Sequence, residues 1–399
     1  MTATAASTPG LSRFSTFVVL LVPLVWTFEA SAVGPDLGRI AAAFPRASAL
    51  QVELVMTVPL ITAVLFSVIS GKLANLIDRK VILIAGLILY GVTGILPAFS
   101  TSMNELLILR LLTGVGVGLI SPVPNAIITE RFSGERQRRM LGMTSSVANV
   151  ANVLASLLSG ALLTYGWQYP FYTFSILFVI AALSVFGIPR AIPGGTTAAA
   201  KTETLGGLPP EVYGLFLFMT ANFAIQAIIT TSLSLFMTSA QIGEPWAIGV
   251  ALIFPGLACF LLSPFYPEIV RWLKAALIPA SFIFYVIGYL MASGARSVLV
   301  ISIAAFVIGI GNAMLTPHLL ALTAGRIRPA QRSIAYGVVT AGIAAGIVLS
   351  PFLQSLLATL GGTASLRAIY RLAAATAAAI GVAAFVFACG RGFAVRARR

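Results

Sequence analysis

Charged residues are scarce in this sequence of 399 residues: 9% are Asp, Glu, Lys or Arg, and only 11 are acidic. Because roughly 25% charged residues is usual for soluble domains, and 59% of this chain is hydrophobic, an ordinary soluble protein is excluded. The single histidine, His318, excludes a histidine-rich metal site, and the two cysteines, Cys259 and Cys389, stand in or beside apolar runs, where a thiol packs as a small apolar group. The sequence contains no phosphate-binding loop, zinc-ligand spacing or Gly-x-Ser-x-Gly motif, so we expect neither a cofactor nor an enzymatic activity.

Most of the sequence consists of long apolar runs. Each is about 20 residues, the length that crosses a bilayer as a helix. The runs are Ser15–Val33, Gln51–Ala74, Val81–Phe99, Leu106–Thr129, Met140–Leu163, Pro170–Ile188, Val212–Met237, Pro245–Phe265, Ala275–Ser293, Val298–Leu320, Ile334–Leu357 and Leu372–Ala388. The sequence therefore predicts an all-α membrane protein with 12 transmembrane helices in two six-helix bundles, residues 1–188 and 211–399, joined by a polar linker at 189–210.

The basic residues favour one side of the membrane. Of the 25 basic residues, 19 fall on one face of this topology and five on the other, and Arg110 lies inside a span. Basic loops stay in the cytoplasm, so both termini and the linker are expected there. The bases are dispersed between apolar runs, which argues against nucleic acid as a partner. Pro122 and Arg131 recur at the same spacing as Pro317 and Arg326, which indicates that the two bundles are pseudo-symmetric copies.

Four motifs carry a resemblance to a known family. The hairpin Gly71-Lys-Leu-Ala-Asn-Leu-Ile-Asp-Arg-Lys80 resembles the signature loop of the major facilitator superfamily, with Asn75 in place of the usual aspartate and Asp78 in place of a glycine. Arg110-Leu-Leu-Thr-Gly-Val-Gly-Val-Gly118 is similar to a motif of its proton-coupled members, and Pro35–Ile40 and Gly166–Phe171 are frequent family features. The drug-and-metabolite:proton antiporters are the most similar branch, although Ala155–Gly160 lacks their proline.

The resemblance implies a monomeric transporter of the bacterial inner membrane that works by alternating access, with a substrate cavity between the bundles near the midplane. Its partners would be a small organic molecule, protons and membrane lipids. In the signature loop, Gly71 would allow two helices to approach closely, and Asn75, Asp78 and Arg79 would form a conformational latch, weakened by the neutral asparagine.

Glu29 is the expected proton carrier. A carboxyl in mid-span costs roughly 2.5–3.5 kcal/mol to insert, so it is expected to face a cavity or a partner. Among the charges we place fully inside the spans, its expected counterpart is Arg110, with which it forms either a working couple or a static ion pair. Asp36, beside Pro35 at the outer boundary, is either a solvated helix end or a second proton-coupling residue.

Polar side chains recur at helical spacing within several runs. We expect the amides to line the substrate cavity, although small polar residues also hold membrane helices together. Two aromatic residues would add flat apolar walls. The expected cavity residues are Trp26, Asn125, Asn149, Asn152, Asn222, Gln226 and Tyr336.

Export driven by protons is the favoured function, and two alternatives stay open. A proton symporter that imports a polar nutrient or organic acid is favoured by the missing antiporter proline and opposed by the apolar second half of the chain. A lipid flippase, or a receptor that has kept the fold, is the other alternative.

Overall fold

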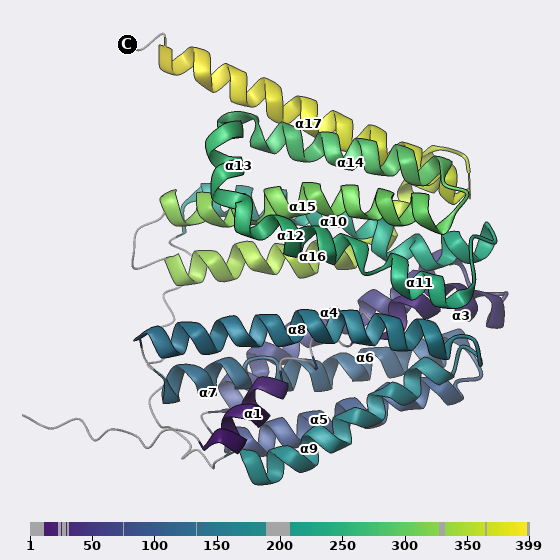
Figure 1. The fold of residues 1–399 in the computed structure, drawn as a ribbon, viewed down its shortest axis with the longest axis vertical. Helices are drawn as coiled ribbons and strands as arrows, with labels where there is room; N and C mark the ends of the chain where they lie inside the picture. Colours follow the sequence, from purple (N-terminus) through teal and green to yellow (C-terminus); the bar gives the residue numbers. More distant parts are fainter. Residues whose placement is uncertain are drawn as a thin grey trace, which may run out of the picture. The chain divides into compact units, whose positions relative to one another are not determined.

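The computed structural model describes residues 12–22, 25, 29, 32–74, 76–132, 134–188, 208–326, 332–363 and 365–396. Within these residues every regular element is helical (Figure 1). Ten stretches are long and apolar enough to cross a membrane: Ala49–Leu73, Arg79–Phe99, Met103–Ile128, Tyr169–Gly187, Pro210–Ser239, Pro245–Leu262, Leu277–Gly294, Val298–Thr323, Ala335–Leu360 and Leu366–Val386. The all-helical, multi-span prediction is confirmed. Twelve spans and cytoplasmic termini stay predictions, and residues 189–207 of the predicted linker lie outside the described part.

Internal contacts group the chain into two compact units. Unit 1 comprises Met1–Val33, Val58–Ser159 and Trp167–Glu203, and unit 2 comprises Gly34–Thr57, Gly160–Gly166 and Thr204–Arg399. This grouping differs from the predicted bundles mainly in placing Gly34–Thr57 with the C-terminal helices. The bundle bounds themselves stay a prediction.

Close helix packing in unit 1 explains the glycines of the Arg110 motif. A Cβ at Gly114 of α6 would lie 2.0 Å from the carbonyl oxygen of Pro59 in α4, so only glycine permits this approach. The run that we expected as one fourth span is interrupted, since α6 ends at Ile120 and α7 begins at Val123. The helices of unit 1 are α1 (Arg13–Leu21), α5 (Arg79–Ile95), α6 (Met103–Ile120), α7 (Val123–Arg131) and α9 (Ile176–Gly187), and two further helices, α4 (Ala49–Leu73) and α8 (Gly134–Leu162), have residues in both units.

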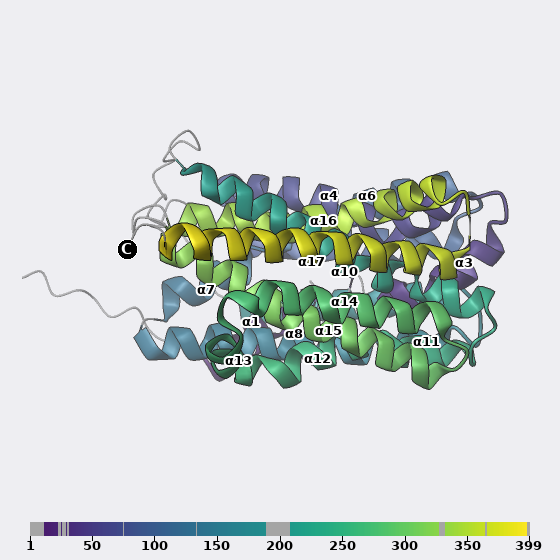
Figure 2. The ribbon, with the colours of Figure 1, turned by 90° about the horizontal axis from the view of Figure 1, so that it is seen from above.

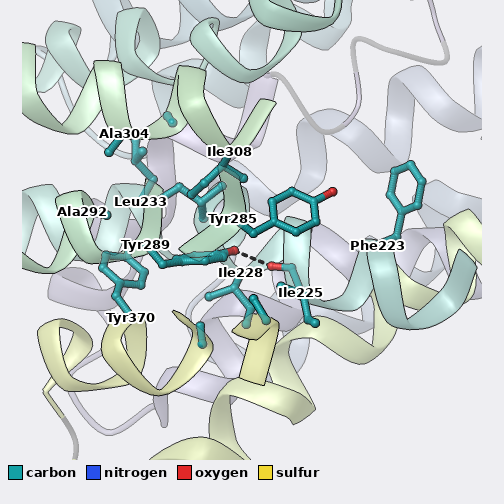
Figure 3. Packing of buried hydrophobic residues seen from close by; sticks show 14 of the residues in the cluster. Phe223, Ile225, Ile228, Leu233, Tyr285, Tyr289, Ala292, Ala304, Ile308 and Tyr370 are labelled. Carbon is teal, nitrogen blue, oxygen red and sulfur yellow. Dashed lines mark hydrogen bonds between the residues drawn. The ribbon is translucent and has the colours of Figure 1, made fainter. Parts of the chain in front are cut away.

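Unit 2 has a mainly aliphatic core that also contains the buried tyrosines Tyr285, Tyr289 and Tyr370. Helix α10 runs along α16, and α14 lies between α15 and α17 (Figures 1 and 2). The Tyr289 hydroxyl donates a hydrogen bond to the carbonyl oxygen of Ile225, so the ring is buried without losing its polar partner (Figure 3). The helices are α3 (Leu37–Ala43), α10 (Pro210–Ser239), α11 (Pro245–Ala251), α12 (Phe254–Leu262), α13 (Tyr266–Leu273), α14 (Leu277–Gly294), α15 (Val298–Arg326), α16 (Arg332–Leu360) and α17 (Leu366–Arg396).

Candidate functional site

Glu29 and Arg110 form a buried ion pair in unit 1. Nη2 of Arg110, in the middle of α6, donates to Oε1 of Glu29, and the two side chains are 0% and 4% exposed. Opposite charges that meet out of water compensate each other's desolvation in part. The structure therefore brings together the two charged residues that the sequence analysis placed inside the spans. Direct contact of this kind is expected both for a proton-coupling pair and for a static ion pair.

Asp36 is fully buried in unit 2, so the expectation of a solvated helix end is wrong. It closes the short 3₁₀ turn η1 (Gly34–Asp36), which Ser234 of α10 fixes in place: its Oγ donates to the carbonyl oxygen of Pro35 and accepts from the backbone N–H of Gly38, at 2.5 and 2.9 Å. Burial raises the pKa of the Asp36 carboxyl well above its ordinary value, and the nearby charge of Arg39 opposes this shift.

Asn222 is the expected cavity residue that the structure describes most fully. It is fully buried, accepts a 2.7 Å hydrogen bond from the hydroxyl of Tyr285 and donates at 3.4 Å to Oδ1 of Asn312, which also accepts from Thr316 at 2.7 Å. This network joins α10, α14 and α15, so in this structure Asn222 serves helix packing.

The other expected cavity residues are spread over several elements. Gln226 is buried on α10, Asn152 and Tyr336 are half-buried, and Asn125 is exposed on α7. Trp26 and the side chain of Asn149 lie outside the described part of the chain. Their role as a substrate cavity stays a prediction.

In the signature loop the structure assigns Asp78 a local role. Its carboxylate caps α5 by accepting a 2.9 Å hydrogen bond from the backbone N–H of Lys80, and Arg79 is buried. Around Gly71 the described residues leave open space where a Cβ would stand. The expected close approach of two helices at Gly71 stays a prediction. Asn75 lies outside the described residues.

Glu53 is a buried acid that the sequence analysis missed. It lies in the second turn of α4, is 2% exposed, and accepts a 2.7 Å hydrogen bond at Oε2 from Nε2 of Gln354 on α16. The same nitrogen donates at 2.8 Å to Oγ1 of Thr231 on α10. An acid near the start of a span has the signature of a solvated helix end, so only the partners, far away in the sequence, reveal that it is enclosed.

A cavity of about 810 Å³ adjoins this cluster within unit 2. Its wall includes Glu53, Gln354, Phe236 and Arg367, from four different helices. The volume is in the range of drug-sized ligand sites. No cluster of three or more acidic, histidine or cysteine side chains suited to a metal ion occurs among the described residues.

Comparison with known proteins decides the family. The model of the Major Facilitator Superfamily matches residues 11–295, which is most of the chain. The chain belongs to the Major Facilitator Superfamily. Membership places the protein among transporters rather than enzymes, and the long apolar helices make it a multi-pass membrane protein.

Solved structures of other transporters share the fold. The nucleoside transporter NupG aligns with a TM-score of 0.80 at 14% identity, covering 94% of this chain and 99% of that one. A bacterial homologue of the human lysosomal transporter Spinster, inward-facing and occupied, aligns with a TM-score of 0.78 at 14% identity over 94% and 96% of the two chains.

Curated relatives match over shorter segments. The multidrug transporter protein MdtP of Bacillus subtilis is 25% identical over 166 residues, covering 41% of this chain and 30% of the relative. The multidrug efflux pump SdrM of Staphylococcus aureus is 25% identical over 223 residues, 55% and 47% of the two chains. The 4-hydroxybenzoate transporter PcaK of Pseudomonas aeruginosa is 31% identical over 141 residues, 34% and 31% of the two chains. The matches to these three relatives span between about a third and a half of the relatives' length.

Proposed function

We propose that this protein exports a small organic molecule across the bacterial inner membrane in exchange for protons. Its transport cycle would be alternating access by twelve spans in two six-helix bundles, with both termini in the cytoplasm. The multidrug names of MdtP and SdrM support export. The basic residues concentrated on one side of the predicted topology support the orientation.

The buried ion pair of Glu29 and Arg110 carries the proton-coupling part of this proposal. Arginine keeps its proton, so Glu29 is the member of the pair that can accept one. While ionised, Glu29 is held by Arg110; on protonation the pair loses its attraction and the arginine charge is left buried. A change of proton occupancy therefore changes the stability of unit 1 around α6, which is what a coupling residue needs in order to bias a conformational cycle.

The test uses the purified protein in proteoliposomes with an imposed proton gradient and ethidium as the transported dye. Glu29→Gln is expected to abolish gradient-driven export, but it also removes the carboxylate that pairs with Arg110. The double variant Glu29→Gln/Arg110→Gln removes both charges and separates folding from coupling. We expect it to be folded, to lack gradient-driven export and to retain counterflow of the dye. Export at the wild-type rate by the folded double variant would disprove the coupling role of Glu29.

A second candidate function is proton-coupled import of an aromatic acid. The match to PcaK, a 4-hydroxybenzoate transporter, favours it. An inward proton gradient that accumulates radiolabelled 4-hydroxybenzoate in right-side-out vesicles, without moving ethidium outward, would select this function over export.

A further inference from the structure

The Glu53 cluster is an incomplete hydrogen-bonding site inside unit 2. Glu53 and Gln354 are 2% and 3% exposed, and Thr231 is fully buried. Both hydrogens of the Gln354 amide are used, one to Glu53 at 2.7 Å and one to Thr231 at 2.8 Å. Oε1 of Gln354, in contrast, is buried and has no hydrogen-bond partner within the described part of the chain. An unsatisfied buried acceptor is destabilising, so a donor from outside the described chain would stabilise this site.

No ion pair joins Glu53 to a basic side chain among the residues that the structure describes. Among the described side chains, the arginine that shares its cavity is Arg367, and this guanidinium is committed elsewhere: it lies 5.2 Å from the ring centre of Phe236 and donates at 2.8 Å to the carbonyl oxygen of Ser293. A buried carboxylate held only by a neutral amide is poorly compensated. Glu29, which pairs directly with Arg110, is in the opposite situation.

The cavity beside Glu53 has an apolar wall as well as this polar end. Leu50, Leu235, Phe236 and Ile369 contribute apolar and aromatic surface, and the volume of about 810 Å³ is large enough for an organic ligand. The ligand that satisfies both ends has a positively charged N–H donor group and an apolar body.

We propose that this cavity binds an amphipathic organic amine in its protonated form. The ammonium group donates to the Glu53 carboxylate and to Oε1 of Gln354, and the apolar part packs against Phe236. The proposal rests on the proposed export function and deepens it, because it names the chemical class of the exported molecule and a second acid that recognises it.

A proton and the amine exclude each other at this site. When Glu53 is protonated, its O–H donates, and the Gln354 amide satisfies it by turning its oxygen towards Glu53 and its NH₂ group away. The cluster then offers no carboxylate and no carbonyl acceptor to an ammonium group. Exchange of one proton for one cation follows from the hydrogen bonding alone.

The ionisable groups around the cavity are few. Helix α4 contributes Glu53 itself to the lining. The lining residues from α10 include Leu235, Phe236 and Ser239, and those from α16 include Gln354 and Ser355; none of these five is ionisable near neutral pH. Helix α17 contributes Arg367 to the lining and, behind it, Tyr370, whose hydroxyl shares a 3.0 Å hydrogen bond with Ser232 and lies within electrostatic range of Glu53. Arg367 is therefore the lining residue whose positive charge would repel a bound cation.

The experiment measures binding of 1-naphthylmethylammonium to the purified full-length protein by calorimetry, with empty micelles subtracted. The wild type is expected to bind the amine, and its affinity is expected to fall as the pH is lowered, because protons compete for Glu53. The N,N,N-trimethyl analogue, which has no N–H donor, is expected to bind more weakly. Absence of binding to the wild type, or equal affinity for the two cations, would overturn the proposal without any variant.

Variants then locate the site. Glu53→Gln is expected to weaken binding about tenfold to a hundredfold, as for loss of a charged hydrogen-bond partner. Arg367→Gln is expected to strengthen it, and the exposed Glu105→Gln, a matched loss of one carboxylate in unit 1, is expected to leave it unchanged. Thermal melting confirms that each variant is folded. Unaltered affinity in folded Glu53→Gln would overturn the proposal. Loss of affinity in Arg367→Gln would also overturn it and would indicate that the cavity binds anions, which binding of 2-naphthoate would test.

The outcome is separable from that of the proposed function. Glu53-dependent binding in a protein that shows no proton-driven export would retain this site and reject the function. Normal export by Glu53→Gln, with unaltered amine binding, would reject the site and retain the function.

Discussion

Removing one partner of the Glu29–Arg110 pair is expected to destabilise the protein far more than loss of an exposed charge. In Arg110→Gln, the Glu29 carboxylate loses its cation in a region where the two side chains are 4% and 0% exposed. Breaking a pair buried to this extent costs about 3–5 kcal/mol, whereas an exposed pair contributes about 0–1 kcal/mol. The free energy of unfolding, measured by denaturant titration in mixed micelles, is expected to fall by the larger amount.

A double-mutant cycle separates the ion pair from the loss of arginine packing. The double variant Glu29→Gln/Arg110→Gln removes both charges of the pair, so neither is left without its counterpart, and its loss of stability is expected to be smaller than the sum of the two single losses. The exposed Arg296→Gln serves as the matched control and is expected to change stability by no more than about 0.5 kcal/mol. A loss below about 1 kcal/mol in Arg110→Gln, or additive single effects, would refute the reasoning.

Two further predictions concern the segment before α4. Gly38→Ala places a Cβ 2.1 Å from Oγ1 of Thr238 and is expected to cost about 1–3 kcal/mol in thermal melts, while Gly214→Ala, with open space around it, is expected to be neutral or stabilising; equal melting temperatures would contradict the packing of α3 on α10. Burial raises the pKa of Asp36, so the native state binds more protons than the unfolded chain and stability falls as pH rises above about 4. Asp36→Asn is therefore expected to raise the melting temperature at neutral pH and to flatten its pH dependence, and parallel curves for variant and wild type would show that Asp36 is not the cause.

The lengths of the apolar runs predicted the long helices well, because a bilayer demands about 20 apolar residues whatever the neighbours are. The run Gln51–Ala74 corresponds to α4 (Ala49–Leu73), and Val298–Leu320 lies within α15 (Val298–Arg326). Interruptions were harder to predict. Pro255 accompanies the break between α11 and α12, as expected for a residue that clashes with the preceding turn, yet Pro317 lies inside the continuous α15. Whether a proline breaks a helix depends on what the neighbouring helices supply.

The charged residues also differ in how far the sequence alone predicted their importance. Glu29 and Arg110 were expected to matter because each is costly alone in a span, and that cost drives opposite charges together even though 81 residues separate them. Glu53 gave no such signal. Its burial depends on Gln354, 301 residues away, a neutral residue that no charge pattern connects to it. A single sequence shows the cost of a charge but not the position of a neutral partner.

The contrast between the two glutamates bears on how proton binding is linked to transport. At Glu29 the negative charge is balanced by Arg110, so protonation breaks an existing interaction and has a structural cost. At Glu53 the charge is held by an amide and a proton removes an uncompensated charge, so protonation and binding of an organic cation are equivalent solutions to one problem. The two acids therefore predict different phenotypes. Neutralising Glu29 is expected to uncouple the cycle from the proton gradient, whereas neutralising Glu53 is expected to change which molecules are accepted, a difference that parallel transport assays with cationic and neutral dyes measure directly.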